Sequence, residues 1–159
     1  MKHTIIRRLG ICALLLTMTG QVEAGRVHQL SYQQLLDASD LVVIAEAEST
    51  QATRERITWG NRNPSIHAVG LSTTLRIAVV LKGDKQLHGC VVHHYRLTEA
   101  DSGAILVDGP DLVSFDTSQN SDYLLFLKRE KDGRYIPVTA PTASALSIFL
   151  IRAHTRGPN

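Results

Sequence analysis

The sequence predicts a mainly β protein, a small OB-like antiparallel barrel that is closed or partly open, with one short helix near its beginning. Roughly five to seven short apolar segments follow one another with turn residues between them, a spacing typical of small β-barrels. Only residues 31–38 combine an N-cap residue with an apolar stripe of helical period. No internal repeat or low-complexity linker interrupts this pattern, so a single domain is expected.

The first 24 residues have the three parts of a secretory signal peptide. Lys2, Arg7 and Arg8 supply positive charge, and an apolar run covers residues 9–19. This run is too short to cross a bilayer as a helix, which takes about 20 residues. Because the small residue Ala24 suits signal peptidase, we expect cleavage after it and an extracytoplasmic protein, periplasmic or secreted.

Cleavage would set both the organisation and the charge of the chain. We expect residues 1–24 to be the signal peptide, residues 25–151 a single β-barrel domain and residues 152–159 a flexible tail. The first 24 residues carry three of the 17 Lys and Arg residues and one of the 15 Asp and Glu residues, so the remaining 135 carry 14 of each. A net charge of zero argues against a nucleic-acid-binding protein, which needs a basic excess.

Cys90 is the only cysteine outside the expected signal peptide. No intramolecular disulfide can therefore form in the mature chain, even in an oxidising compartment, and stability has to come from core packing. We expect Cys90 to be a buried thiol that packs like a small apolar residue, with a reactive or intermolecular thiol as the alternative.

The first two expected elements lie between residues 31 and 48. Ser31 is a suitable N-cap for a helix that ends at Ala38, and Leu35, Leu36 and Tyr32 would form its apolar stripe. Residues 41–48 begin with β-branched residues and end in alternation, which predicts a strand that is buried at its start.

A polar stretch separates that strand from the next one. Residues 49–65 are interpreted as a loop or a frayed hairpin end, because they are polar and end close to Pro64. Residues 71–81 then alternate between apolar and polar side chains, so we expect their odd-numbered residues to face the core.

The second half of the chain continues with short strands. Residues 90–97 form the next expected strand, followed by a polar loop, a possible short strand at 105–107 and an apolar step at 112–115. Residues 123–127 are apolar on both faces and are therefore expected to run through the middle of the fold.

Turn chemistry marks the end of the domain. A turn at residues 131–133 places Gly133 where a positive φ is favoured and leads into residues 134–139 as a hairpin. Residues 145–151 fit either a last strand or a short helix, and their isoleucine and phenylalanine content favours a strand.

Three segments resemble a known family when they are taken together. They are residues 39–43 (SDLVV), residues 80–83 (VLKG), and residues 122–128 (DYLLFLK) with 132–135 (DGRY). Their order and separation resemble uncharacterised secreted bacterial proteins, whose pattern is similar to the netrin-like, or tissue-inhibitor-of-metalloproteinase-like, OB-fold barrel. The resemblance covers residues 31–139 and implies the fold. Inhibitors of that family begin with a zinc-chelating cysteine, whereas this mature chain would begin at Gly25, so that mode of inhibition is not implied.

Arg54, Arg56, Trp59 and Arg62 are the candidate partner-binding residues. Trp and Arg are over-represented at binding hot spots, and the chain has one Trp, placed here in a polar stretch. These charges would fit an anionic envelope component or an acidic protein patch. The alternative is that Trp59 folds back to cap one end of the barrel while the arginines are solvated.

A metal site is the second interpretation of the chain's chemistry. His88, Cys90 and His94 have the same parity on the expected strand and could hold a soft metal ion together, as in a periplasmic metal-handling protein. His93 would face the opposite side from His94. The spacing matches no standard zinc or copper motif, so the alternative is that these histidines are solvated or hydrogen-bonded.

Catalytic motifs are missing from the sequence, and no cofactor is expected. It contains no nucleophile elbow, no zincin helix and no phosphate-binding glycine loop. A cryptic hydrolase stays open as a third hypothesis and predicts a deep pocket that gathers His with Asp or Ser. We therefore expect an exported, non-catalytic binding or inhibitor-like module that acts through residues 49–66 and 98–104, without a membrane span and without nucleic acid as its partner.

Overall fold

The computed structural model describes residues 29–59, 65–102 and 110–154, so the expected signal peptide and the possible strand at 105–107 lie outside the described residues. Within them the chain forms short helices around one sheet. The elements are α1 (Tyr32–Ala38), β1 (Leu41–Trp59), β2 (Ile66–Lys82), β3 (Gly89–Leu97), α2 (Glu99–Ser102), β4 (Asn120–Arg129), β5 (Tyr135–Pro137), η1 (Pro141–Ser147) and β6 (Ile148–His154).

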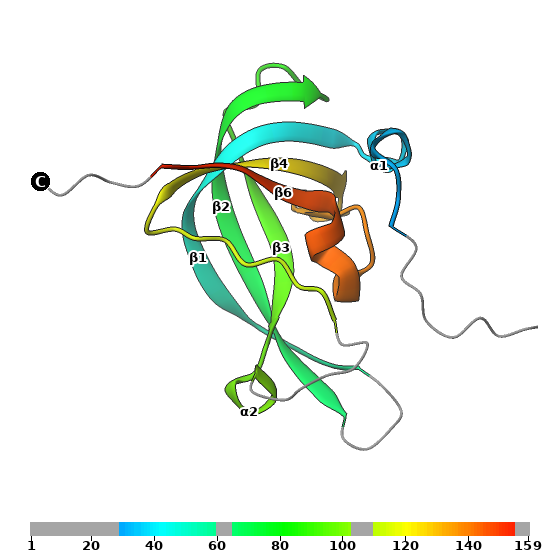
Figure 1. Cartoon of the computed structure of the whole chain (residues 1–159), viewed down its shortest axis with the longest axis vertical. Helices are drawn as coiled ribbons and strands as arrows, with labels where there is room; N and C mark the ends of the chain where they lie inside the picture. Colours follow the sequence, from blue (N-terminus) through cyan, green and yellow to red (C-terminus); the bar gives the residue numbers. More distant parts are fainter. Residues whose placement is uncertain (1–28, 60–64, 103–109, 155–159) are drawn as a thin grey trace, which may run out of the picture.

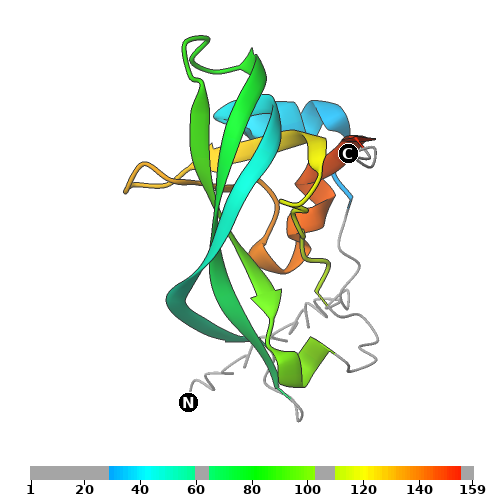
Figure 2. The same cartoon turned by 90° about the vertical axis from the view of Figure 1, so that its left-hand side faces the viewer.

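The sheet closes on itself through five strands. Its order is β1-β2-β3-β5-β4-β6, and an additional pairing between β1 and β4 completes the ring (Figures 1 and 2). All pairings are antiparallel except that of β3 with β5, which meet at Val92 and Tyr135. β6 lies outside the ring and pairs with β4 alone. The expected small OB-like barrel with one short N-terminal helix is therefore confirmed.

β1 is much longer than the expected strand. Residues 49–59, expected to be a loop or a frayed hairpin end, continue β1 and pair with β2 from Thr74 back to Ile66. β3 pairs with the other edge of β2, so the three strands form an arm that extends from the barrel (Figure 1). The polar composition of residues 49–59 is the reason that a strand was not expected here. The side chains of residues 49–59 stay largely exposed because this half of β1 pairs with β2 alone, so it needs no apolar face.

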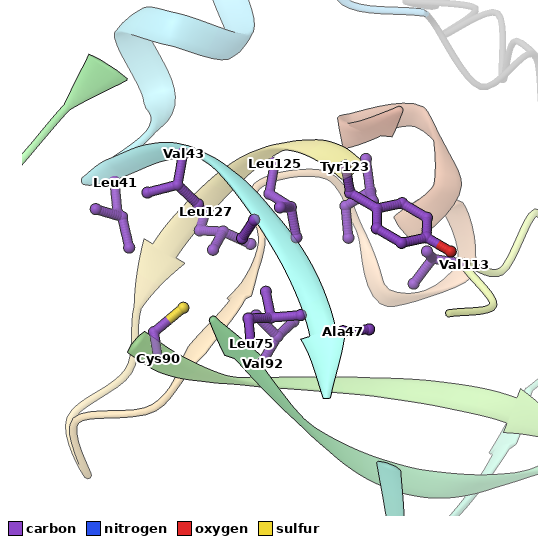
Figure 3. Packing of buried hydrophobic residues seen from close by; sticks show 12 residues of the cluster. Leu41, Val43, Ala47, Leu75, Cys90, Val92, Val113, Tyr123, Leu125 and Leu127 are labelled. Atoms are coloured by element: carbon purple, nitrogen blue, oxygen red, sulfur yellow. The ribbon is translucent and has the colours of Figure 1, made fainter. Parts of the chain in front are cut away.

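The interior of the barrel is filled by apolar side chains from β1, β2, β3, β4 and β6 and by Val113, which lies in no strand (Figure 3). Its buried residues are Leu41, Val43, Ala45, Ala47, Leu75, Cys90, Val92, Val113, Tyr123, Leu125, Leu127 and Ile148. Each large aliphatic side chain removed from water contributes about 1.5–3 kcal/mol to stability. The expected central position of residues 123–127 is confirmed, since Leu125 and Leu127 are completely buried.

Helix α1 covers a second, smaller apolar cluster on the outside of the barrel. Ser31 and Gln34 form a capping box at its start, which satisfies backbone N–H groups that the first turn leaves free. Leu35 packs with Val42 and Phe126 in this cluster. Leu36 and Tyr32 of the expected apolar stripe are instead exposed, and the Tyr32 ring packs on the rim of the cluster against Phe126 and Phe149.

The alternation expected for residues 71–81 holds for the first half of the segment. Leu71, Thr73 and Leu75 are buried, whereas Val79 and Leu81 are 45% and 51% exposed. The register places Ile77 opposite Ala45 but Val79 opposite Ile44, so β2 has one extra residue at this point. After such a bulge, the side chains that would have faced the core face solvent, and the others face the core. The even-numbered Val80 therefore packs against the core, and its odd-numbered neighbours do not.

The last part of the chain agrees with most expectations. Gly133 has φ of 90° in the turn before β5. The residues of the apolar step at 112–115 form no strand, and the backbone N–H of Val113 donates to Ser144 Oγ of η1. The last strand begins at Ile148, after η1, and runs to His154, three residues into the expected tail.

Candidate functional site

The candidate site is built around a β-bulge in β1. Between Ala52 and Arg56 the register of β1 against β2 shifts, so that residues 53–55 lie opposite Gly70. A Cβ at Gly70 would lie only 2.5 Å from Thr53 Oγ1 and 3.0 Å from Glu55 Cβ. A glycine is therefore required at this point, because it lets the bulge fold down over β2.

The bulge brings Glu55 to side chains of β3, with which β1 does not pair. Glu55 Oε2 lies 3.0 Å from Nε2 of His93, and the Tyr95 hydroxyl donates to Glu55 Oε1 at 2.6 Å. Burial, the hydrogen bond to Glu55 and its negative charge together raise the pKa of Tyr95. Tyr95 therefore acts as a hydrogen-bond donor at every physiological pH.

The turn between β4 and β5 supplies the other side of the site. Glu130 Oε2 lies 3.8 Å from Nδ1 of His93 and 3.5 Å from a guanidinium nitrogen of Arg134. Arg134 is also held by Asp132, whose carboxylate accepts from Nε at 2.7 Å. We call Glu55, His93, Tyr95, Glu130 and Arg134 the Glu55–His93 cluster. His93 is only 4% exposed, so its ring is enclosed between two carboxylates.

A cavity of about 80 Å³ adjoins this cluster. Its lining residues are His93, His94, Tyr95, Glu130, Ile136, Pro137, Thr139, Pro141 and Ser144. Across the described residues, three buried side-chain atoms lack a hydrogen-bond partner: His93 Nε2, His94 Nδ1 and Glu130 Oε2. His93 Nε2 has ion-pair proximity to Glu55 without hydrogen-bond alignment. All three atoms belong to residues that line this one cavity.

His94 reaches into the barrel from the opposite face of β3, as expected from the alternation. Its Nε2 lies 2.8 Å from Thr73 Oγ1, which in turn lies 2.7 Å from Thr50 Oγ1. Burial, and secondarily the charge of His93, lower the pKa of His94 to about 4. The carbonyls of Val113 and Tyr95 act in the opposite direction, but neither forms a hydrogen bond with Nδ1. His94 is therefore neutral near pH 7.

Three of the four expected partner-binding residues lie on β1 instead of a loop. Arg56 donates to the backbone carbonyls of Thr53 and Glu55, so it braces the bulge. Trp59 ends β1 and meets the Tyr95 ring edge-on, with 5.9 Å between ring centroids. Arg54 is exposed on the bulge, and Arg62 lies outside the described residues. Trp59 thus borders the Glu55–His93 cluster.

The alternative metal ligands do not meet in one place. His88 is exposed before β3, Cys90 lies in the barrel core, and His94 is engaged with Thr73. Burial raises the pKa of the Cys90 thiol to about 11, which disfavours the thiolate that metals bind. In the described part of the chain, no group of three or more His, Cys, Asp or Glu side chains is arranged to hold a metal ion.

A hydroxyl and a histidine do pair, as the hydrolase hypothesis requires, but not in a reactive arrangement. Thr73, the partner of His94, is completely buried, and His94 Nδ1 has no group to orient the ring. A larger cavity of about 450 Å³ reaches His94 from the side of residues 110–115. Its lining residues include Asp111 and Ser114, which supply the residue types that a hydrolase pocket needs.

Comparison with known proteins gives no family assignment. No family model and no curated protein matches the chain. The resemblance to the netrin-like barrel thus stays a prediction. In the ranges that the structure describes, none of the helices has the length and apolar character needed to cross a membrane.

The sequence interpretation did not find the Glu55–His93 cluster. His93 was correctly expected on the face opposite His94, but as a solvated or hydrogen-bonded histidine. Its partners come from the bulge of β1 and from the β4–β5 turn, and nothing in local sequence links these segments to β3. The one available indication was Gly70, because a glycine within a strand marks a bulge or the close approach of another backbone.

Proposed function

We propose that this protein is an exported, non-catalytic binding module that holds a protein partner on the face formed by Trp59 and the Glu55–His93 cluster. Export rests on the charge, apolar run and cleavage residue of the first 24 residues. An inhibitor-like role, implied by the netrin-like resemblance, is one form of this proposal. Any inhibition would use this face instead of the chain's N-terminus.

The observation that carries the proposal is the Trp59–Tyr95 ring pair beside the cluster. Both rings are only partly buried, although aromatic side chains of this size stabilise a fold most when they are enclosed. Partly exposed Trp and Tyr residues with an adjacent Arg are typical of binding hot spots. Arg134 of the cluster, 36% exposed, supplies that Arg.

The location on the barrel supports the same conclusion. OB folds bind ligands along their second and third strands and through the loops that join strands 1 with 2 and 4 with 5. Trp59 ends β1 at the connection to β2, Tyr95 lies on β3, and Glu130 and Arg134 flank the turn between β4 and β5. The face therefore occupies the position that this fold uses for recognition.

The charges on the face favour a protein over an anionic polymer. Glu55, Glu130 and Asp132 are set against Arg134, while the guanidinium of Arg56 is turned toward its own backbone. Such an acidic, mixed surface repels nucleic acid and other polyanions. The expectation of an anionic partner depended on three arginines, but Arg56 is engaged with its own backbone and Arg62 lies outside the described residues, which leaves Arg54 as the exposed one. That expectation is accordingly replaced by one of a protein with positive groups.

Trp59 offers a direct test because it is the only tryptophan in the chain. The mature protein would be titrated with the protein, polysaccharide and lipid fractions of the cell envelope while tryptophan emission is recorded. We expect a saturable change with the protein fraction, which Tyr95→Ala weakens and Tyr32→Ala, on the opposite helix α1, leaves unchanged. A saturable change with polysaccharide or lipid alone would overturn the choice of a protein partner, and no change with any fraction would overturn the face.

A further inference from the structure

The cavity beside His93 is lined by polar groups that lack partners. His93 and His94 are 4% and 2% exposed, yet each has a ring nitrogen without a hydrogen bond. Glu130 adds a buried carboxylate oxygen, Oε2, that accepts no hydrogen bond, although it lies 3.5 Å from a guanidinium nitrogen of Arg134. Buried polar atoms are normally paired, and leaving one unpaired costs about 1–3 kcal/mol. Of these atoms, His93 Nε2 lies beside the Glu55 carboxylate, so His94 Nδ1 and Glu130 Oε2 are the two for which a group inside the cavity could complete the hydrogen bonding.

The space is large enough for a ligand group. A cavity needs a volume of roughly 10–15 Å³ to hold a single water, whereas this cavity measures about 80 Å³. The 3.8 Å between Glu130 Oε2 and His93 Nδ1 is too long for a direct hydrogen bond. A small group placed beside these two atoms could interact with both of them.

The charge of that group follows from the atoms that face it. In the neutral imidazole of His93 with its proton on Nε2, beside the Glu55 carboxylate, Nδ1 carries a lone pair and can only accept. Glu130 is also an acceptor, so two acceptors face each other across the gap. Their common partner must donate several hydrogen bonds, and the carboxylates of Glu55 and Glu130, which outnumber the one neighbouring guanidinium of Arg134, favour a cation.

An ammonium group fits these requirements better than a metal ion or a sugar. A metal ion would need three or more suitable ligands, and the described side chains offer no such group. An ammonium needs only acceptors, and it has three N–H donors to share among them. Ile136, Pro137 and Pro141 give the cavity an apolar wall that suits an alkyl stem. The hydroxyls of Thr139 and Ser144, which also line it, are already hydrogen-bonded within the protein, so the cavity offers little to a hydroxylated ring.

We propose that this cavity is a subsite for the side-chain ammonium of a lysine, held between Glu130 and His93. The proposal rests on the function proposed above and deepens it, because the lysine would belong to the bound protein. The lysine stem would lie along Ile136 and Pro137, and Tyr95 and Trp59 would contact the residues around it. The partner is then a protein that presents an exposed lysine to this face.

n-Butylammonium chloride is the probe, because it reproduces the end of a lysine side chain. The side-chain nitrogen signals of His93 and His94 would be followed by NMR in the mature protein labelled with ¹⁵N-histidine, at constant ionic strength and mildly alkaline pH. We expect a saturable shift of the His93 Nδ1 signal, with a dissociation constant on the order of 10 mM for a ligand of about five heavy atoms. n-Butanol and glucosamine should produce no saturable shift at the same concentrations.

Variants identify the carboxylate involved. Glu130→Gln keeps the shape but removes the charge and should weaken butylammonium binding by about tenfold or more. Glu48→Gln, at a half-exposed carboxylate next to Arg76, is the matched control and should bind as the unchanged protein does. The histidine spectra without probe show whether each variant is folded.

Several results would overturn the subsite. They are the absence of a saturable shift in the unchanged protein, an equal response to butanol, or glucosamine binding as tightly as butylammonium. These results concern the unchanged protein and do not depend on the folding of a variant. If the Trp59 titration detects a protein partner while butylammonium fails, only the lysine subsite falls. If butylammonium binds and no partner is detected at Trp59, the ammonium chemistry stands and the proposed face falls.

Discussion

Glu55 on β1 contacts His93 on β3 at 3.0 Å, although β2 lies between these two strands in the sheet. The contact passes over β2 at Gly70, where the β1 bulge lies directly above a residue without a side chain. One glycine thus allows a carboxylate of the extended arm to reach the barrel wall. This single relationship places the Glu55–His93 cluster next to Trp59.

Gly70→Ala is expected to displace the bulge and destabilise the fold by about 1–3 kcal/mol, the usual cost of overpacking. The added Cβ would lie 2.5 Å from Thr53 Oγ1 and 3.2 Å from Nε2 of His93, so Glu55 must move away. Urea unfolding measures the stability, and histidine NMR reports the lost contact. Thr74→Ala, at an exposed position of the same strand, should change stability by less than about 0.5 kcal/mol. Equal effects of the two substitutions would contradict the role of Gly70.

His94 should make the protein sensitive to acid. Its pKa falls from 6.5 to about 4 on folding, so between these values the unfolded chain binds a proton that the folded chain does not. Its neutral form therefore supports folding fully above pH 6.5, and this support is lost as the pH falls toward 4. The loss between pH 7 and about pH 5 should be roughly 2 kcal/mol.

The acid effect is measured as a difference between variants. Urea unfolding at neutral and acid pH should show a smaller acid loss for His94→Asn than for the unchanged protein. His88→Asn, at an exposed histidine just before β3, should keep the full loss. The assignment to His94 fails if His94→Asn loses as much stability on acidification as the unchanged protein.

Tyr95 should ionise at a pH well above the ordinary range of a tyrosine. Its pKa is raised by burial and by Glu55, to which it donates a hydrogen bond. An alkaline titration followed by tyrosinate absorbance should show one late step, absent in Tyr95→Phe and shifted to lower pH in Glu55→Gln. A late step that persists in Tyr95→Phe would assign it to another tyrosine.

Cys90 should be inert to thiol reagents while the protein is folded. It is 9% exposed within the core cluster, and burial raises its pKa to about 11, so little thiolate exists near neutral pH. An aromatic disulfide reagent should label Cys90 in urea and leave it largely unlabelled in buffer. Rapid labelling of the folded protein would instead support the alternative of a reactive thiol.

The barrel was predictable from the sequence because its interior obeys local rules. The alternation before Leu75, the doubly apolar run around Leu125 and the glycine turn at Gly133 each appear as short-range patterns. The polar arm of β1 was missed, since a strand paired on one side needs no apolar face. The exchange of buried and exposed positions after Ile77 was missed, because the alternation of apolar and polar residues in the sequence does not reveal a bulge.

The site was less predictable than the barrel for a physical reason. Trp59 was correctly chosen from the sequence as a residue of interest, but its neighbours come from β3 and the β4–β5 turn. Glu55, His93 and Glu130 carry no motif, and their meeting depends on strand register and on a bulge over Gly70. Such contacts are set by tertiary structure, which a single sequence does not display.

The central claim is that the face around Trp59 and Tyr95 holds a protein partner, and photo-crosslinking in cells tests it most directly. A photoreactive amino acid would replace Arg54, exposed on the bulge, in one variant and Lys85, exposed in the turn after β2, in a control. We predict that the Arg54 position forms a discrete crosslink to one protein, that Tyr95→Ala in the same variant abolishes it, and that the Lys85 position forms none. Identical crosslinks from both positions, or none from the Arg54 position, would contradict this account of the protein.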